Sequence, residues 1–540
     1  MKIKYTAIAL LSLTLFSCTD GFDRDNENPN NPVNVPTYGI YNNATKGLVG
    51  TAIRGSFGSA RMTLPWVQYS AQRNYTEEDR YQYREGTPVS VFNAYYQQAN
   101  NFKKIIELNT DPTTKVIAAT YGSNDMQIAS SRIFLAYAFQ NLVDMFGDIP
   151  YWSYGNKNPD FEALDIDNLT PKYAKQEDIY ADLLKELEEA VAMIDANPSE
   201  TVIFYNKASY TGENVFKNDI SKLRKFANSL RLRIATRLKN SPLSGLAQTH
   251  ITSAIASGVM QSNSDSVGVI YEENSINPAP IYIDFFMDNR TDYTVSKPFI
   301  DLLKGQVATS GLTTPDPRLQ KVVAPIGISK GRSLAQDYTE TTDLTKYQGM
   351  PFGITSLQTS SQRPGASLYS YSIFKQNYTE YLMTYAEVEF LLAEANGWDN
   401  TNYVNGVTAS MEQWGVNPAD IATYVGALPA VNEENVMNQK YIALFMQPYE
   451  AWSEYRRTGF PTFLIKPGDT VNLINPIGGS LTAVFTITPA AAALNGNMTD
   501  LPARIRYPYL EQTLNKTNYE AAVSRLGGDT MQEKLIWDNN

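Results

Sequence analysis

The chain has 540 residues, of which 45 are Lys or Arg and 56 are Asp or Glu, so its formal net charge is −11. A chain of this size and composition folds as a globular protein and needs neither disulfides nor metal ions to hold its core. One Cys and one His exclude an internal disulfide and multi-histidine metal centres, and a Ser-His-Asp triad would have to use His250. The acidic balance argues against a nucleic-acid partner.

The N-terminus has the pattern of an export signal. Met1–Lys4 is basic, and Tyr5–Phe16 is an apolar stretch of about a dozen residues, the length of the central region of a signal peptide rather than of a membrane span. Cys18, the one Cys of the chain, follows shortly after this stretch, and the arrangement resembles the lipobox of bacterial lipoproteins. We therefore expect a signal peptide over residues 1–17 and lipidation at Cys18; the alternative is a Cys that falls within a signal peptide by chance.

A polar segment follows, and residues 18–36 are predicted to form a lipidated tether. From position 19 the segment reads TDGFDRDNENPNNPVNVP, a composition typical of extended, poorly packed chain. Asp23, Asp25 and Glu27 alternate as in a calcium loop, but the central Gly and the distal Glu of such a loop are missing. A solvated spacer is the favoured interpretation, with structural calcium as the alternative; no other cofactor is expected.

Helical periodicity dominates the middle of the chain. Apolar residues recur every three or four positions from Phe216 to Leu238, which predicts one amphipathic helix. Its other faces carry Lys and Arg, which in an acidic protein are expected to pair with carboxylates of neighbouring elements. The residues at 132–146 are apolar on nearly all sides, as in a buried helix. Similar stripes occupy 179–194, 388–395 and 441–455.

These patterns predict one mature domain over residues 37–540, with a helical scaffold at 92–257 and 380–457. Small Ala residues between larger ones favour close helix pairs, as in helical repeat proteins. Residues about 258–379 are rich in Asn, Ser, Thr, Gly, Pro and Tyr, which predicts an irregular lobe. In the C-terminal region, 458–540, alternating runs around Gly478-Gly479-Ser480 predict a β-hairpin. The expected fold class is mostly α.

Aromatic and polar side chains gather in two segments without helical period. The chain has 35 Tyr, more than a core requires, so some are expected at a wet recognition surface that stacks on sugars or lines peptide pockets. For any one of these rings, the alternative is packing between the lobe and the helices. The candidate ligand-binding residues are Trp66, Tyr69, Asn74, Tyr75, Arg80, Tyr81 and Tyr83 in the first segment and Tyr282, Asn289, Arg290 and Tyr293 in the second.

Several longer stretches, together with the lipobox, point to one known family. They are AYAFQNLVDMFGDIPY (136–151), TPKYAKQEDIYADLLKELEEA (170–190), KFANSLRLRIATR (225–237), TYAEVEFLLAEA (384–395) and ALFMQPYEAWSEYRRTGFP (443–461). With them the chain resembles the SusD/RagB family, and within it the SusD-like 2 branch.

The resemblance implies a surface-exposed lipoprotein of the outer membrane with tetratricopeptide-like helix pairs. Such a protein captures nutrient oligomers, which are oligosaccharides or oligopeptides, and delivers them to a SusC-like TonB-dependent barrel. The resemblance implies no enzymatic activity. Between a glycan and a peptide ligand, the sequence does not choose.

The rival class of function is a glycoside hydrolase, because that reaction needs two carboxylates and no His. Glu77-Glu78-Asp79, beside aromatic residues, is the local candidate for such a pair. Adjacent acids in one exposed run are usually solvated, so a binding protein is the favoured interpretation. A surface or pilus subunit is a third class, which the helical content opposes.

Overall fold

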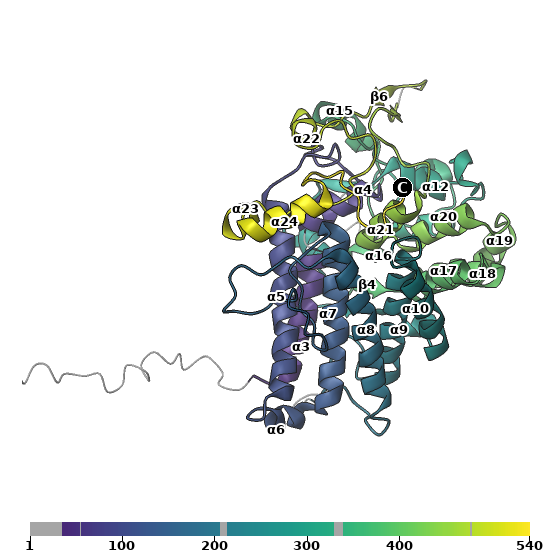
Figure 1. Ribbon diagram of the computed structural model, residues 1–540. Coiled ribbons are helices and arrows are strands. Elements are labelled where there is room, and N and C mark those ends of the chain that lie inside the picture. The colour runs from purple at the N-terminus through teal and green to yellow at the C-terminus, as the bar shows by residue number, and fades with distance from the viewer. Residues whose placement is uncertain (1–34, 55, 206–212, 329–337, 476–477) are drawn as a thin grey trace, which may run out of the picture.

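The computed structural model describes residues 35–54, 56–205, 213–328, 338–475 and 478–540 (Figure 1). The predicted signal peptide, Cys18, and the acidic run at Asp23, Asp25 and Glu27 lie outside these residues, so lipidation and calcium binding stay predictions. The first described helix, α3, begins at Thr37, directly after the predicted end of the tether.

Long helices lie side by side along one half of the molecule (Figure 1). α3 contacts α5, α5 contacts α7, and the sequence of neighbours continues through α8 and α9 to α10. This arrangement confirms the predicted mostly helical fold with tetratricopeptide-like helix pairs. The array begins before the predicted bound at residue 92, because α3 already packs against α5. Its helices are α3 (Thr37–Gly47), α5 (Gly86–Thr110), α6 (Lys115–Ala118), α7 (Asn124–Phe146), α8 (Gln176–Asp195), α9 (Ile220–Arg237) and α10 (Ser244–Ser257).

α7 is the buried helix that its apolar sequence predicts. The side chain of Ser123 caps its first turn by accepting a hydrogen bond from the backbone N–H of Met126 at 3.3 Å. Every residue from Met126 to Phe146 is buried. α5 and α8 both pack against it, so no face of the helix from Met126 to Phe146 is exposed to solvent.

A second group of helices contacts the array through α17, which packs against α9. The stripe at 441–455 is divided between two helices rather than forming one, which corrects the sequence-based reading. α20 ends at Ala443, Met446 takes φ +69°, and α21 starts anew at Pro448, where proline suits a first turn but cannot continue a helix. The helices are α17 (Tyr385–Ala395), α18 (Asn400–Gln413), α19 (Pro418–Gly426), α20 (Glu433–Ala443) and α21 (Pro448–Thr458).

The intervening lobe is built from short elements, as its composition predicts. β1 (Ser70–Gln72) pairs antiparallel with β3 (Tyr293–Val295), with Gln72 opposite Tyr293, and β2 (Val267–Ile270) pairs antiparallel with β4 (Thr379–Met383). The first pairing ties the segment around residue 70 to the lobe. The predicted hairpin is confirmed as β5 (Thr470–Asn472) and β6 (Thr482–Val484).

The remaining elements are single turns and short helices that link these parts. Those of the N-terminal segment and the lobe are η2 (Leu48–Ile53), η3 (Ser56–Thr63), α4 (Leu64–Trp66), η4 (Ala119–Tyr121), η5 (Asn263–Asp265), α11 (Pro280–Tyr282), η6 (Ile283–Met287), α12 (Lys297–Leu303), η7 (Ala308–Ser310), α13 (Leu319–Val322), η8 (Leu344–Lys346), α15 (Ser356–Gln362), η9 (Arg363–Gly365) and α16 (Tyr371–Phe374). The C-terminal ones are α22 (Pro489–Asn495), α23 (Glu511–Leu514) and α24 (Lys516–Leu526).

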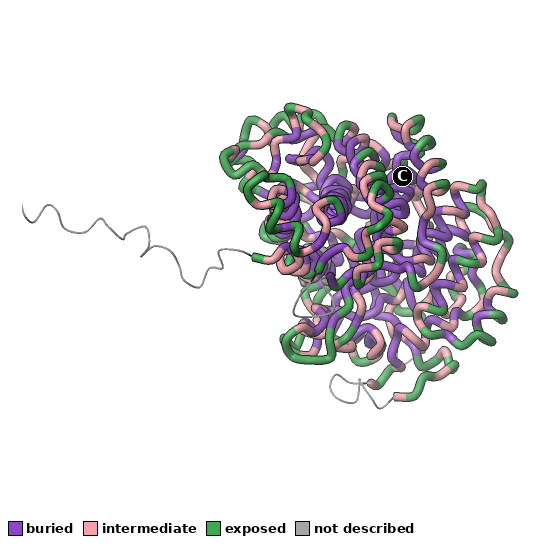
Figure 2. Tube along the Cα trace, turned by 90° about the horizontal axis from the view of Figure 1, so that it is seen from below, coloured by how far each residue is buried: buried purple, intermediate pink, exposed green. Residues whose placement is uncertain are grey.

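A main core runs through the helical array and the lobe, and a second, smaller cluster lies among α17, α18, α19 and α20. Buried stretches lie inside the molecule and exposed stretches at its periphery (Figure 2). The C-terminal region packs back onto the array. Trp537 is fully buried, and its indole N–H donates to the hydroxyl of Tyr180 on α8 at 2.6 Å. The Trp452 indole on α21 donates to the carbonyl of Pro502 at 2.6 Å. These long-range contacts make the C-terminal region part of the same folded unit.

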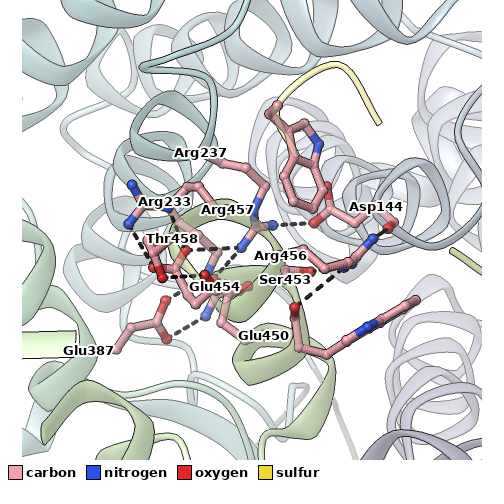
Figure 3. A network of polar contacts seen from close by, with 12 residues as sticks. Asp144, Arg233, Arg237, Glu387, Glu450, Ser453, Glu454, Arg456, Arg457 and Thr458 are labelled. Atoms are coloured by element: carbon pink, nitrogen blue, oxygen red, sulfur yellow. Dashed lines mark hydrogen bonds and ion pairs between the residues drawn. The ribbon is translucent and has the colours of Figure 1, made fainter. Parts of the chain in front are cut away.

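Buried ion pairs join the two helical groups (Figure 3). Arg237 on α9 pairs with Asp144 on α7 and Glu450 on α21. Arg233, one turn earlier, pairs with Glu387 on α17 at 2.6 Å. The basic face of α9 therefore pairs with neighbouring carboxylates, as its sequence predicts.

Candidate ligand-binding surface

Four of the predicted ligand-binding rings are core side chains, each at most 5% exposed. Tyr69 stacks on Tyr441 of α20 with ring centroids 4.6 Å apart, and Tyr81 meets Phe485 edge-on at 5.4 Å. A ring without an exposed face cannot stack on a ligand. The structure therefore reassigns the following residues to the core: Trp66, Tyr69, Tyr81 and Tyr293.

Two further candidate rings are half-buried. The guanidinium carbon of Arg506 lies 5.1 Å from the ring centre of Tyr83, and burial raises the pKa of the Tyr83 hydroxyl well above its usual value. A hollow of about 20 Å³ beside Tyr83 has room for roughly one water molecule and not for a sugar ring. Tyr282 tilts against Phe286 with ring centroids 5.0 Å apart. Protein groups thus already cover part of both rings.

Tyr75 is different, because its side chain is 49% exposed. It also adopts φ +57°, a left-handed conformation that costs a bulky residue roughly 1–3 kcal/mol. Backbone strain of this kind gathers at ligand sites, because the surrounding structure must enforce it. Exposure is what singles out Tyr75 as a recognition residue, since the buried Tyr81 shares the positive φ.

Asp292 brings the two predicted groups together. The side-chain amide of Asn74 donates to Asp292 Oδ1 at 3.2 Å, and Nη1 of Arg290 lies 3.6 Å from Asp292 Oδ2. The cause is the pairing of β1 with β3, since residues that follow β1 meet residues that precede β3. Arg290 is 48% exposed, and Asn289 beside it is exposed with φ +59°.

Two arginines at this place were not predicted from the sequence. The guanidinium carbon of Arg61, at the end of η3, lies 5.1 Å from the ring centre of Tyr75, and its Nη2 lies 3.3 Å from Asp292. Arg363, directly after α15, donates from Nη1 to Asn74 Oδ1 at 2.7 Å. Their contacts are long-range, and no local pattern encodes them. We define the Tyr75 surface as Arg61, Asn74, Tyr75, Arg290, Asp292 and Arg363.

α15 runs along the segment that carries Tyr75. At its first residue, the Ser356 hydroxyl donates to Glu77 at 3.0 Å, and Arg363, directly after its last residue, reaches Asn74. Arg80, the remaining candidate, lies 3.9 Å from Glu77. The helix therefore forms one flank of the Tyr75 surface.

The acidic run considered for hydrolysis is engaged in other contacts. Asp79 is fully buried and accepts a hydrogen bond from the backbone N–H of Gln72 at 2.7 Å, and burial raises the pKa of its carboxyl well above the usual value. Glu78 lies 2.5 Å from Arg84, and Glu77 accepts from Ser356. These contacts tie the run to the local fold and do not favour a hydrolase.

His250 is also placed structurally, in the contact between α9 and α10. It is 6% exposed, and its Nδ1 accepts a hydrogen bond from Nε of Arg231 at 2.7 Å. Burial lowers the pKa of the imidazole, and the neighbouring Arg231 lowers it further. The neutral ring thus accepts a hydrogen bond from a buried cation.

A wider hollow of about 180 Å³ lies where the lobe meets α19. Its one lining aromatic, Tyr424, is 3% exposed. The nearby Arg318 is already paired with Asp316 at 2.6 Å. This hollow offers a ligand neither a ring face nor a free cation, so the Tyr75 surface is the better candidate.

The described residues contain neither a metal-binding cluster nor a membrane-spanning helix. No group of three or more His, Cys, Asp or Glu side chains in these ranges is arranged to hold a metal ion. None of the helices described here has the length and hydrophobicity of a membrane span.

Solved structures share this fold. A chitin-binding SusD homologue from Flavobacterium johnsoniae is 21% identical, with a TM-score of 0.69 over 93% of this chain and 99% of that one. A SusD homologue from Parabacteroides distasonis is also 21% identical, with a TM-score of 0.73 over 93% and 98%. A structure described as a chitin-binding protein is 24% identical, with a TM-score of 0.69 over 93% and 100%. At these identities the likeness shows the fold.

The family comparison reaches further than the fold. No curated protein matches the chain. Residues 29–476 match the SusD-like 2 family, described as "Starch-binding associating with outer membrane". That match covers most of the chain, from the predicted tether to the C-terminal hairpin, and the chain belongs to the SusD-like 2 family.

Proposed function

We propose that this protein is a surface-exposed lipoprotein of the outer membrane that binds nutrient oligosaccharides and delivers them to a SusC-like TonB-dependent barrel. The family description supports a starch-type ligand and an association with the outer membrane. Two of the similar structures are described as chitin-binding. These descriptions favour a glycan over the oligopeptide that the sequence leaves open.

The observation that carries the proposal is the exposed ring of Tyr75, with polar side chains around it. Sugar rings present C–H faces to an aromatic ring and hydroxyl groups to the polar groups beside it. Asn74 and Arg290 lie on either side of Asp292, next to this ring. The Tyr75 surface is open, which suits a chain-like ligand that extends beyond the contact.

Binding without a reaction is part of the proposal. The carboxylates of the acidic run are held by Arg84, Ser356 and a backbone amide, and His250 accepts a hydrogen bond from Arg231. Retention and transfer of the ligand need no bond cleavage. The ligand is therefore expected to leave the protein intact.

The test is calorimetric titration with pools of oligosaccharides of defined length, applied to the wild type and Tyr75→Ala. Loss of the ring is expected to weaken binding about tenfold, because a stacked aromatic contributes roughly 0.5–1.5 kcal/mol beyond its area. The melting temperature should change little, since half of the side chain is exposed.

Tyr509→Ala is the matched control. Tyr509 is 48% exposed, close to the exposure of Tyr75, but it precedes α23 in the C-terminal region. Its replacement should leave binding unchanged. Equal binding by wild type and Tyr75→Ala would remove the proposed site, and release of shortened saccharides would overturn the non-enzymatic function.

A further inference from the structure

Arginine side chains are concentrated on the Tyr75 surface although the chain as a whole carries a net charge of −11. Three residues of this surface are arginines: Arg61, Arg290 and Arg363. A fourth arginine, Arg73, directly precedes Asn74 at the end of β1. Elsewhere in the described chain, most arginines lie within ion-pair distance of an acid, although Arg456 does not. On α9, for example, Arg224, Arg233 and Arg237 each pair with at least one carboxylate.

Two of the four arginines have no such match. Among the described residues, neither Arg73 nor Arg363 has a carboxylate within ion-pair distance. Nε of Arg73 is buried without a hydrogen-bond partner in the described parts of the chain. Burial lowers the pKa of the Arg73 guanidinium, and the nearby positive charge of Arg363 lowers it further. Two like charges thus influence each other, and neither is paired with an acid among the described residues.

The acids that are present are shared. Asp292 lies 3.3 Å from Arg61 and 3.6 Å from Arg290, so one carboxylate faces two guanidinium groups. Glu78 lies 3.7 Å from Arg61, but it also pairs with Arg84 at 2.5 Å. The surface around Tyr75 therefore keeps an excess of positive charge that no protein group in the described structure neutralises.

We propose that the Tyr75 surface selects oligosaccharides that carry carboxylate or sulfate groups, such as uronic acid or sulfate-ester residues. The inference rests on the proposed function, since it names the chemical class of the same ligand. The sugar ring stacks on Tyr75, and the acidic substituents lie against Arg363 and Arg290. A guanidinium group binds a planar carboxylate or a sulfate through two parallel hydrogen bonds, which gives selectivity as well as affinity.

A saccharide fits the surface better than an acidic peptide does. Peptides commonly bind by adding a strand to a free sheet edge. Here β1 and β3 pair with each other, and Ser296, directly after β3, bridges to Met350 on the other side. The acidic peptide is kept as an outcome of the test.

The test compares four probes of matched length by calorimetry at low salt: oligogalacturonate, a sulfated galactan (carrageenan) oligosaccharide that carries no carboxylate, a neutral chitin oligosaccharide and oligoglutamate. Wild-type protein is expected to bind the carboxylate or the sulfate probe at least about tenfold more tightly than the neutral one. The preference should shrink as the salt concentration rises, because salt screens exposed charges. The two acidic sugars differ in their anionic group, so the tighter of them identifies which group is recognised.

Arg363→Gln is the decisive variant. It should weaken binding of the acidic saccharide about tenfold more than binding of the neutral one, because it removes a charge and keeps most of the side-chain volume. Lys115→Gln on α6 removes the same charge from an exposed position at the opposite end of the molecule from α15 (Figure 1), and it should have no effect. Unchanged melting temperatures would show that both variants are folded.

The two proposals fail in different ways. Equal affinity for neutral and acidic saccharides, with no effect of Arg363→Gln, would overturn the anionic ligand and leave oligosaccharide binding standing. Tighter binding of oligoglutamate than of any saccharide, or binding of none of the saccharides, would overturn both.

Discussion

At the scale of single residues, two neighbouring tyrosines have opposite roles. Tyr75 and Tyr81 both adopt positive φ, at 57° and 61°, yet Tyr75 is 49% exposed and Tyr81 is 1% exposed. The difference comes from their neighbours: the Tyr81 ring packs against Phe485, whereas the guanidinium of Arg61 lies over the ring of Tyr75. Replacing Tyr81 is therefore expected to disturb the fold, and replacing Tyr75 is expected to disturb recognition.

Tyr81→Ala is predicted to lower the free energy of unfolding by about 3 kcal/mol, because deletion of a buried aromatic ring leaves a cavity. Urea-induced unfolding followed by circular dichroism measures this change. Tyr75→Ala should stay within about 0.5 kcal/mol of the wild type, as is usual at exposed positions. A Tyr81→Ala variant as stable as Tyr75→Ala would contradict the packing described for Tyr81.

At the scale of elements, buried charges hold α9, α17 and α21 together (Figure 3), and Lys440 adds α20 to them. Glu454 on α21 lies 2.7 Å from Lys440 on α20 and 2.8 Å from Arg457 one turn later. Arg457 in turn lies 2.7 Å from Glu394 on α17. Each buried charge has a partner from another helix, so loss of one member leaves its partner uncompensated in the core.

The same contacts set a pH dependence. Burial alone would raise the pKa of Glu454, but Arg457 and Lys440 outweigh it and hold that pKa well below the usual 4.5. A carboxyl whose folded pKa is depressed contributes stability above its unfolded pKa and loses it as the pH falls toward the folded pKa. The contribution of Glu454 is therefore complete at neutral pH and declines below about pH 4.5.

Glu454→Gln is predicted to cost about 3 kcal/mol of unfolding free energy at neutral pH, the lower end of the range for breaking a buried ion pair. Urea unfolding at about pH 7 and about pH 3 should show a smaller difference between variant and wild type in acid, because below about pH 4.5 Glu454 of the unfolded wild type binds a proton, which stabilises the unfolded state relative to the folded one. Glu520→Gln, in an exposed pair with Lys516 on α24, should change stability by less than about 0.5 kcal/mol. A pH-independent difference for Glu454→Gln would be incompatible with the depressed pKa.

At the scale of the whole molecule, the helical array separates the start of the described chain from the Tyr75 surface. α3 begins toward the α6 end of the array, whereas α15, which flanks the Tyr75 surface, lies at the other end (Figure 1). If the predicted tether precedes α3, the Tyr75 surface lies at the end of the molecule opposite to the point where the tether joins it. This arrangement supports a ligand-binding surface that stays accessible on an anchored protein.

Cys18→Ala is predicted to release the protein from the membrane fraction and to abolish labelling by fatty acids, because acyl chains on the predicted lipidation site would supply the anchor. In the wild type, mild detergent should extract the chain together with a large outer-membrane barrel. Cell fractionation and mass spectrometry of the detergent extract measure both results. Retention of Cys18→Ala in the membrane would refute lipidation. Repeated recovery of the wild type alone, from cells that do express the barrel, would count against delivery.

The helices were largely predictable, because their determinants are local. The apolar stripe from Phe216 predicts α9, and the all-round apolar stretch before Phe146 predicts α7. A helix buried on one face has apolar residues every three or four positions, whereas a helix buried on all faces is apolar throughout. The basic face of α9 likewise predicted its acidic partners, though not which acids they are. The break between α20 and α21 was missed, although Pro448 was a local signal for it.

The family, the helical class and the expectation of an aromatic recognition surface were thus determined by the sequence alone. Which ring is exposed was decided by tertiary structure. Tyr69 is buried because Tyr441, more than 370 residues away along the chain, packs on it. Tyr75 gains Arg61 and Asp292 because β1 pairs with β3. Burial and charge at one residue depend on neighbours that the fold supplies from distant segments, and local sequence does not encode them.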